Sequence, residues 1–384
     1  MFAKYSARYL APVALIALSS VTATAPAAPQ PRPGTVVSVR PLGADELIPQ
    51  AAKGFRIIYR TAGQNGEPQV SGGSVYLPAG TPPAGGRALV SWAHGTSGMT
   101  AGCAPNLTGG MADTFNETPQ LSTYLARGYA VAATDYIGLG GPGTYEYLAS
   151  RAAGHAVLDI VRAARRLDPG LAKSFAIAGH SIGGQAALAA ARMHPGYAPD
   201  LDLRGTLAYA PTSNVEDLIG TLGRPGVPAV PALNGLHARL VMILAGLDHA
   251  RPDVRVTDFL SPHGKEAIAI ARRGRDCVKS LESAVAGKPI GLLFSAPLSD
   301  PQLMAALRDY LAVPTTGHRR PLLLLQGAAD TVQPIPTTVL LQQQLRHSGA
   351  DSHLATHASA SHFTILNSAA PEAQAFLARV LTVR

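Results

Sequence analysis

The chain has 384 residues, of which 47% are hydrophobic and 15% are charged. This apolar fraction excludes wholesale disorder, and the 39 Gly and 31 Pro, which follow no fixed period, exclude a collagen-like chain. The formal net charge of +8 comes from short basic clusters without interleaved aromatic residues, so nucleic-acid binding is not expected. We interpret the charge as a solvated surface with an attraction to anionic lipid surfaces or polymers.

The beginning of the chain has the pattern of a cleavable export signal. Lys4 and Arg8 precede an apolar stretch, 11–21, that is about half the length needed to span a bilayer. Small residues follow at 25–27, so we expect a signal peptide over 1–27 and a soluble, secreted or periplasmic product. An uncleaved anchor is the alternative. In an oxidising compartment, Cys103 and Cys277 are either bridged or buried as free thiols.

The expected elements begin with a proline-rich, extended lead-in over 28–41. The segments 55–60 and 70–77 then predict an antiparallel hairpin. From residue 87 onward, short apolar runs alternate with helix-like segments, which predicts a parallel sheet covered by helices on both faces. The expected strands are 88–93, 129–134, 175–178, 205–210 and 321–325, and the expected helices are 151–167, 183–193, 337–347 and 372–383.

The alternation of strands and helices stops between residues 213 and 317. This stretch contains several helix-like segments and many prolines, and it is too long for one crossover connection. We expect it to be a mainly helical insertion, a cap or lid, over the carboxyl edge of the sheet. The predicted organisation is a core in two parts, 28–212 and 318–384, interrupted by this insertion (213–317).

The strongest motif is Gly-His-Ser-Ile-Gly at 179–183. It lies between an expected strand and an expected helix, which is the setting of a nucleophile elbow. Glycine is needed at Gly179 and Gly183 because the sharp turn brings the strand and the helix close together. Ser181 is therefore the candidate nucleophile, with its hydroxyl expected to be exposed above the sheet.

A serine hydroxyl needs a base, and the base needs an orienting acid. In enzymes with such an elbow, the chain order is Ser, then acid, then His. Asp330 ends a short turn after the strand 321–325, so it is the predicted acid. The rival acids are Asp300, Asp309 and Asp351, and a turn-forming Asp that bonds only its own backbone is the structural alternative.

The candidate base is His362, in a loop that follows the last expected strand, 353–357. His353 and His357 lie on one face of that strand, and we expect them to be structural. A metal site built from the three histidines is the alternative, but no carboxylate stands at ligand spacing. The prediction is a hydrolase without metal or organic cofactor.

Acyl transfer also needs N–H donors for the negative charge that develops on the carbonyl oxygen. One candidate is the backbone N–H of Ile182, directly after Ser181. The other is the backbone N–H of Thr96, in a Gly-containing loop after the strand 88–93. A plain glycine turn is the alternative interpretation of that loop.

A competing motif is G-x-G-x-x-G at 138–143, with Asp159 about 20 residues further on. It would indicate a dinucleotide-binding enzyme. Asp159 falls inside an expected helix rather than at the end of a second strand, and an exported enzyme has little access to NAD. We therefore do not expect this function.

Taken together, these motifs resemble the α/β-hydrolase fold and, more narrowly, the secretory lipase family. The resemblance rests on residues 91–98, 103–105, 133–140, 179–184 and 326–330, and covers most of 50–384. It implies cleavage of carboxylic esters, from lipids or small molecules, and a helical lid at the position of the insertion. It also implies a bridge between Cys103 and Cys277.

We therefore predict an exported serine lipase or esterase that acts through Ser181, His362 and Asp330 and an acyl-enzyme. A serine peptidase and an acyltransferase are alternatives that use the same triad. A peptidase would want a fixed acid for a substrate amine, and the sequence offers none. A silent binding module would lack a triad member, and all three are present.

Overall fold

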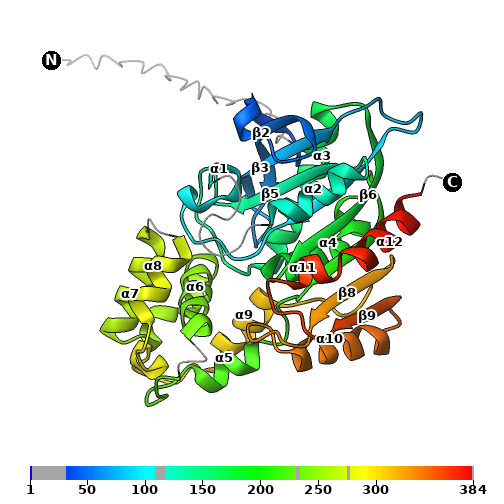
Figure 1. Cartoon of the computed structure of the whole chain (residues 1–384). Helices are drawn as coiled ribbons and strands as arrows, with labels where there is room; N and C mark the ends of the chain where they lie inside the picture. The colour runs from blue at the N-terminus through cyan, green and yellow to red at the C-terminus, as the bar shows by residue number, and fades with distance from the viewer. Residues whose placement is uncertain (2–31, 109–116, 231–233, 275–276, 383–384) are drawn as a thin grey trace. The chain divides into compact units, whose positions relative to one another are not determined.

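The computed structural model describes Met1 and residues 32–108, 117–230, 234–274 and 277–382 (Figure 1). Apart from Met1, the predicted signal peptide (1–27) lies outside the described residues. The description below concerns residues 32–382.

Nine strands in the described part of the chain form one mixed sheet, in the order β1-β2-β3-β5-β4-β6-β7-β8-β9. The pairs from β1 to β5 are antiparallel, and all pairs from β5 through β9 are parallel. The predicted parallel sheet is thus present, extended by three antiparallel strands. The strands are β1 (Val36–Pro41), β2 (Ala51–Ala62), β3 (Pro68–Pro78), β4 (Arg87–Ala93), β5 (Ala130–Ile137), β6 (Leu171–His180), β7 (Asp202–Tyr209), β8 (Leu322–Gly327) and β9 (Ser352–His357).

The expected hairpin is β2–β3, but the expected lead-in over 28–41 needs a correction. Its second half is strand β1, which pairs with β2. Five of the six residues of β1 are exposed, so the strand has no buried side-chain row. The alternation that marks a half-buried strand is therefore absent from its sequence.

Helices cover both faces of the sheet, as the alternation of side chains along β4 requires. Leu89 belongs to the core under α3 (Ser150–Leu167) and α4 (Ile182–Tyr197). Val90 and Trp92 point to the opposite core, which also contains residues of α2 (Thr118–Ala126) and α12 (Ala370–Leu381). Figure 1 shows α2 and α12 in front of the sheet and α4 behind it. The remaining short helices of the two core parts are η1 (Ala44–Glu46), η2 (Ala101–Cys103), α1 (Pro105–Thr108), α10 (Ile335–His347) and α11 (Ile365–Ser368).

Between β7 and β8, every regular element of the described residues is helical. Helix α6 is buried almost all round by its neighbours, which matches its continuous apolar sequence from Leu240 to Leu247. Figure 1 shows α6, α7 and α8 grouped beside the sheet. No described helix combines the length and apolarity that membrane crossing requires. The elements are α5 (Glu216–Leu222), α6 (Asn234–Ala250), η4 (Pro252–Val254), η5 (Val256–Phe259), α7 (Pro262–Arg273), α8 (Cys277–Val285), η6 (Ile290–Leu293) and α9 (Pro301–Leu311).

A disulfide joins the insertion to the core beyond β4. Cys103 ends η2 and Cys277 begins α8, and their Cα atoms are 5.4 Å apart across 174 residues of chain. Two hydrogen bonds accompany the bridge. The Val278 N–H donates to the Ser97 carbonyl at 3.1 Å, and the Thr100 hydroxyl donates to the Gly274 carbonyl at 3.1 Å. The insertion is therefore tied directly to the loop that follows β4.

We expect the protein to unfold with no free thiol, and reduction to destabilise it. A bridge that closes so long a loop contributes about 2–5 kcal/mol to the free energy of unfolding. Thiol titration in denaturant without reductant should find no reactive cysteine, and urea unfolding should shift to lower concentration after reduction. Two reactive thiols per chain in exported material would contradict the bridge.

Candidate active site

Ser181 lies at the junction of β6 and α4 with a backbone conformation that few non-glycine residues adopt. Its φ is 58° and its ψ is −118°. Backbone hydrogen bonds maintain this conformation, because the Ser181 N–H donates to the Tyr209 carbonyl at 2.8 Å and the Ser181 carbonyl accepts from Thr212 at 3.1 Å. This geometry matches the strained strand-to-helix turn expected of an elbow.

The glycines on either side of Ser181 have no room for a side chain. A Cβ on Gly179 would lie 2.1 Å from the Gly183 carbonyl oxygen, and one on Gly183 would lie 1.9 Å from the Ala93 carbonyl oxygen. The contacted atoms are backbone, so they cannot swing aside. The motif therefore needs glycine at both positions because strand and helix pack against each other there.

Ser181 differs from the sequence prediction in its exposure, since only 4% of it is accessible. The prediction was a hydroxyl exposed above the sheet. Thr96, His180 and His362 at the same edge are also buried. The loops that carry these residues close the edge around the elbow, so substrate must enter between them.

Asp330 and His362 meet at the carboxyl edge of the sheet. The Nδ1 atom of His362 lies 2.8 Å from Oδ2 of Asp330. The other carboxylate oxygen, Oδ1, accepts the N–H groups of Val332 and Gln333 at 2.8 Å each, which fixes the turn after β8. Gln326 donates to Oδ2 at 3.1 Å. Asp330 is thus held rigidly while one oxygen faces the imidazole.

The two side chains have shifted pKa values. Burial, together with the positive charges of His180 and Arg239, lowers the pKa of His362 to about 4, although the hydrogen bond to Asp330 raises it. Burial acts to raise the pKa of Asp330, but the hydrogen bonds from His362, Gln333 and Val332 hold it below its usual value. At neutral pH the pair is a carboxylate beside a neutral imidazole, which is the state a general base needs.

His362 reaches the elbow through His180, the residue before Ser181. The two imidazole rings have centroids 4.8 Å apart, and Nε2 of His180 lies 2.9 Å from the main-chain oxygen of His362. Among the described residues, no hydrogen bond joins the Ser181 hydroxyl to His362. Such contacts often form only when substrate binds.

The two expected oxyanion donors lie on either side of the elbow. Ile182 is the first residue of α4, so its N–H has no acceptor within the helix. Thr96 is buried in the loop after β4, and its hydroxyl lies 2.7 Å from the hydroxyl of Tyr147. That bond holds the side chain of Thr96 and fixes the loop.

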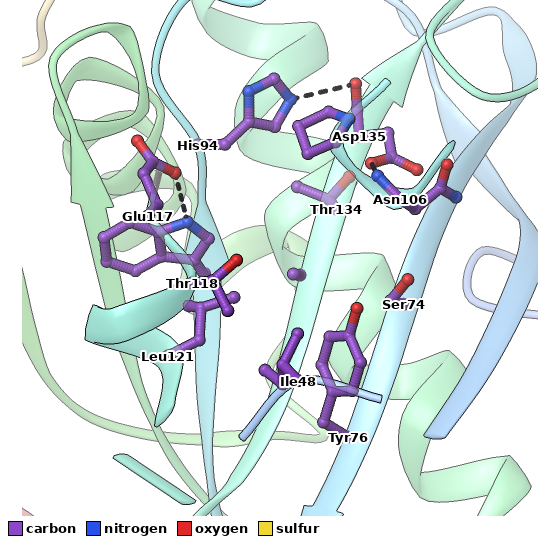
Figure 2. A pocket seen from close by; sticks show the side chains of 13 residues that line it. Ile48, Ser74, Tyr76, His94, Asn106, Glu117, Thr118, Leu121, Thr134 and Asp135 are labelled. Carbon is purple, nitrogen blue, oxygen red and sulfur yellow. Dashed lines mark hydrogen bonds between the residues drawn. The ribbon is translucent and has the colours of Figure 1, made fainter. Parts of the chain in front are cut away.

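Glu117 was not found from the sequence, yet it contacts three parts of the site. Its carboxylate accepts the Trp92 indole N–H at 2.8 Å and the Gly95 N–H at 2.9 Å, and it lies 3.2 Å from Nδ1 of His180. These partners are 22 to 63 residues away in the chain, so no local pattern could indicate the contact. Figure 2 shows the Glu117 carboxylate directed at an indole nitrogen.

A pocket with about 450 Å³ of unfilled space lies beside this loop (Figure 2). Glu117 and His94 line it together with Asp135 and Asn106. Burial raises the pKa of Asp135 to about 8, so its carboxyl is mostly protonated at neutral pH. Both polar atoms of the Asn106 side chain are buried without a hydrogen-bond partner in the described part of the chain. The pocket is polar on this side and apolar around Leu121.

The rival acids lie elsewhere. Asp300 caps the N-terminus of α9, accepting the Leu303 N–H at 2.8 Å, and Asp309 pairs with Arg151 at 2.9 Å. Asp351 is exposed before β9.

The other residues of the competing interpretations are also placed apart from the site. His353 and His357 lie on β9, and Asp159 lies inside α3, where Arg162, Tyr197 and Thr61 bond its carboxylate. The described residues hold no group of three or more His, Cys, Asp or Glu side chains arranged for a metal ion. Asp159 therefore does not occupy the strand-end position of a ribose-binding acid.

Comparison with known proteins agrees with this architecture. A family model described as secretory lipase matches residues 110–382. The chain is 28% identical over 347 residues to a probable inactive lipase of Mycobacterium tuberculosis, which covers 83% of this chain and 72% of that protein. It is 24% identical over 371 residues to lipase A of Arthroderma benhamiae, covering 90% and 75%. The X-ray structure of Candida antarctica lipase A in its closed state is similar with a TM-score of 0.72 at 18% identity, covering 92% of this chain and 84% of that one.

The sheet order, the flanking helices and these similarities define an α/β-hydrolase, and within that class a carboxylic ester hydrolase. The chain belongs to the secretory lipase family. The predictions of fold and family made from the sequence motifs are thus confirmed.

Proposed function

We propose that the protein is an exported lipase or esterase in which Ser181, His362 and Asp330 form the catalytic triad. The observation that carries the proposal is the 2.8 Å contact between His362 and Asp330, beside a serine held at a φ of 58°. One relative is named a probable inactive lipase, so activity depends on this chain's own side chains. All three side chains that acyl transfer needs are present here.

The proposed reaction has two steps. The Ser181 hydroxyl attacks the ester carbonyl while Nε2 of His362 takes its proton, and the N–H groups of Ile182 and Thr96 hold the oxyanion. His362 gives the proton to the departing alcohol as the C–O bond breaks, leaving an acyl-enzyme. Water then attacks the acyl group through the same base, releasing the acid and restoring Ser181.

We also propose that residues 213–317 act as a cap over this site. The support is the direct attachment of the insertion to the loop after β4, through Cys103–Cys277 and the bond from Val278 to Ser97. Movement of the cap would therefore be transmitted to the loop that carries Thr96. Export is supported by the pattern of residues 1–27 and by the secretory family.

A phosphonate ester with a p-nitrophenol leaving group tests the nucleophile. The Ser181 oxygen should form a bond to phosphorus as p-nitrophenolate leaves, with one equivalent released per chain. Peptide mass spectrometry should locate the adduct on Ser181. Hydrolysis rates over p-nitrophenyl esters of increasing chain length, with a p-nitroanilide control, then define the substrate class. An unlabelled protein, or label on another residue, would reject the proposed nucleophile.

The pH dependence of the reaction follows from the pKa of His362. The base must be neutral to accept a proton, and its pKa of about 4 is lower than the usual ~6.5 of imidazole. Because the pKa is depressed, kcat/KM should stay nearly constant from about pH 8 to pH 5 and fall about tenfold per pH unit below the pKa. Initial rates on a soluble ester, with fold checked by circular dichroism, measure this profile. An apparent pKa near that of free imidazole would contradict the environment described here.

A further inference from the structure

His180 is placed between two hydrogen-bond acceptors. Its Nδ1 faces Oε1 of Glu117 at 3.2 Å, and its Nε2 faces the main-chain oxygen of His362 at 2.9 Å. A neutral imidazole has one N–H and one lone-pair nitrogen, so it can donate to only one of these partners. Donation on both sides requires one more proton, either on the ring or on the Glu117 carboxyl.

Both members of this pair are buried, His180 with 2% exposure and Glu117 with 4%. A buried charge is costly unless it is paired and hydrogen-bonded. Glu117 meets that requirement, since both its oxygens also accept N–H groups, from Trp92 and Gly95. The pair with its shared proton is overall neutral and fully bonded through these contacts.

The contacts of the pair connect the moving parts of the site. Glu117 holds the backbone of Gly95, directly before Thr96, and His180 directly precedes Ser181. His180 also holds the main chain of His362. One hydrogen-bonded chain therefore runs from the oxyanion loop through the elbow to the loop of the base.

We propose that Glu117 and His180 share a proton and act as a unit that positions the oxyanion loop and His362 and keeps a positive charge against the His362 ring. The proposal rests on the proposed function, because it assigns these residues to the same triad. Both are positioning residues, since neither contacts the reacting atoms. The charge has a direct consequence for His362, whose ring lies 4.8 Å from that of His180.

The effect of the charge has a definite sign. A cation beside His362 disfavours a second cation on its ring, and His180 is among the groups that lower the pKa of His362. Asp330 acts in the opposite direction, and Arg239 of α6 acts in the same direction as His180. His94, in the loop after β4, is the remaining titratable group that feels the charge of Glu117. Removal of the His180 charge should therefore raise the pKa of His362.

The test compares Glu117→Gln, His180→Phe and the double variant, with kcat, KM and the pH profile measured on a p-nitrophenyl ester. At pH 8, where His362 is neutral in every variant, each single change should lower kcat about 10- to 100-fold with KM nearly unchanged. The apparent pKa of kcat/KM should rise toward ~6.5 in both. The double variant should resemble either single one, because the two residues act through one shared proton.

Gln120→Leu is the matched control. Gln120 lies on α2 three residues after Glu117, is equally buried, and donates to the Tyr209 hydroxyl at 3.1 Å. This variant should lose stability without any shift of the pH profile. If Glu117→Gln and His180→Phe keep the wild-type profile, whatever their kcat, the role is only structural and the inference is wrong. If Glu117→Gln fails to fold, His180→Phe alone decides through its profile.

Failure of the proposed function would look different. In that case wild-type protein would not be phosphonylated on Ser181, before any variant of Glu117 is made. A labelled, active wild type with unshifted profiles in Glu117→Gln and His180→Phe would overturn only the shared-proton pair. Ring-nitrogen NMR of the wild type gives a direct measurement, because His180 should show both nitrogens protonated or hydrogen-bonded to a proton on Glu117.

Discussion

Ser181→Ala is expected to lower ester hydrolysis by about 10⁴-fold or more. The fold should be unaffected, because the hydrogen bonds that hold the elbow come from the Ser181 main chain, to Tyr209 and Thr212. Alanine has the same backbone cost as serine at a φ of 58°, so the turn is no more strained than before. The measurement is kcat/KM on a p-nitrophenyl ester, with circular dichroism and Tm as fold checks.

Ser213→Ala is the matched control for this variant. Ser213 is 2% exposed and bonds the Thr337 carbonyl, so its loss changes packing without removing the proposed nucleophile. The control should keep near-normal turnover. Retention of more than about a tenth of the activity in Ser181→Ala would remove it as nucleophile.

The same experiment extends to the base. His362→Ala and the double variant with Ser181→Ala should be about as inactive as Ser181→Ala alone, because triad members act as a unit. His357→Ala should remain active, since His357 lies on β9 with Glu372 as its nearest acid, at 3.8 Å. An inactive His357→Ala beside an active His362→Ala would reverse the assignment.

The parts of the fold that the sequence predicts are those with a strong local signal. A parallel strand buried on both faces must be apolar at successive positions, and β4 to β8 show this as short runs of small and aliphatic residues. The helices α3 and α4 follow with clear periodicity or an alanine-rich face. Their order then places Ser181, Asp330 and His362 at the carboxyl edge of one sheet, because each follows a parallel strand.

Other features depend on contacts that are distant in the chain. Strand β1 is exposed along most of its length, so nothing in its side-chain pattern distinguishes it from an extended lead-in. Helix α2 has a weak signal in Leu121, Tyr124 and Leu125, whose i, i+3, i+4 spacing marks its buried face. Glu117 has no such signal, because its function comes from partners on β4, β6 and the loop between β4 and η2.

Asp330→Asn is expected to lower kcat by about 10⁴-fold with little change in substrate binding. An asparagine can keep its carbonyl oxygen on the N–H groups of Val332 and Gln333 and so preserve the turn. Its NH₂ group then replaces the oxygen that faces His362. That group donates to Nδ1, which forces the proton of the neutral imidazole onto Nε2.

With a proton on Nε2, His362 has no lone pair for the hydroxyl of Ser181. The new NH₂ group also faces the donating amide of Gln326, 3.1 Å from the original oxygen, so that bond is lost as well. The variant should fold, bind a non-hydrolysed ester analogue normally and turn over poorly. Asp351→Asn is the control, since Asp351 is exposed before β9 and offers only its main chain, which accepts from Leu322 at 2.8 Å. Normal turnover in Asp330→Asn with loss in Asp351→Asn would move the orienting acid to Asp351 and show that the His362–Asp330 contact does not serve catalysis.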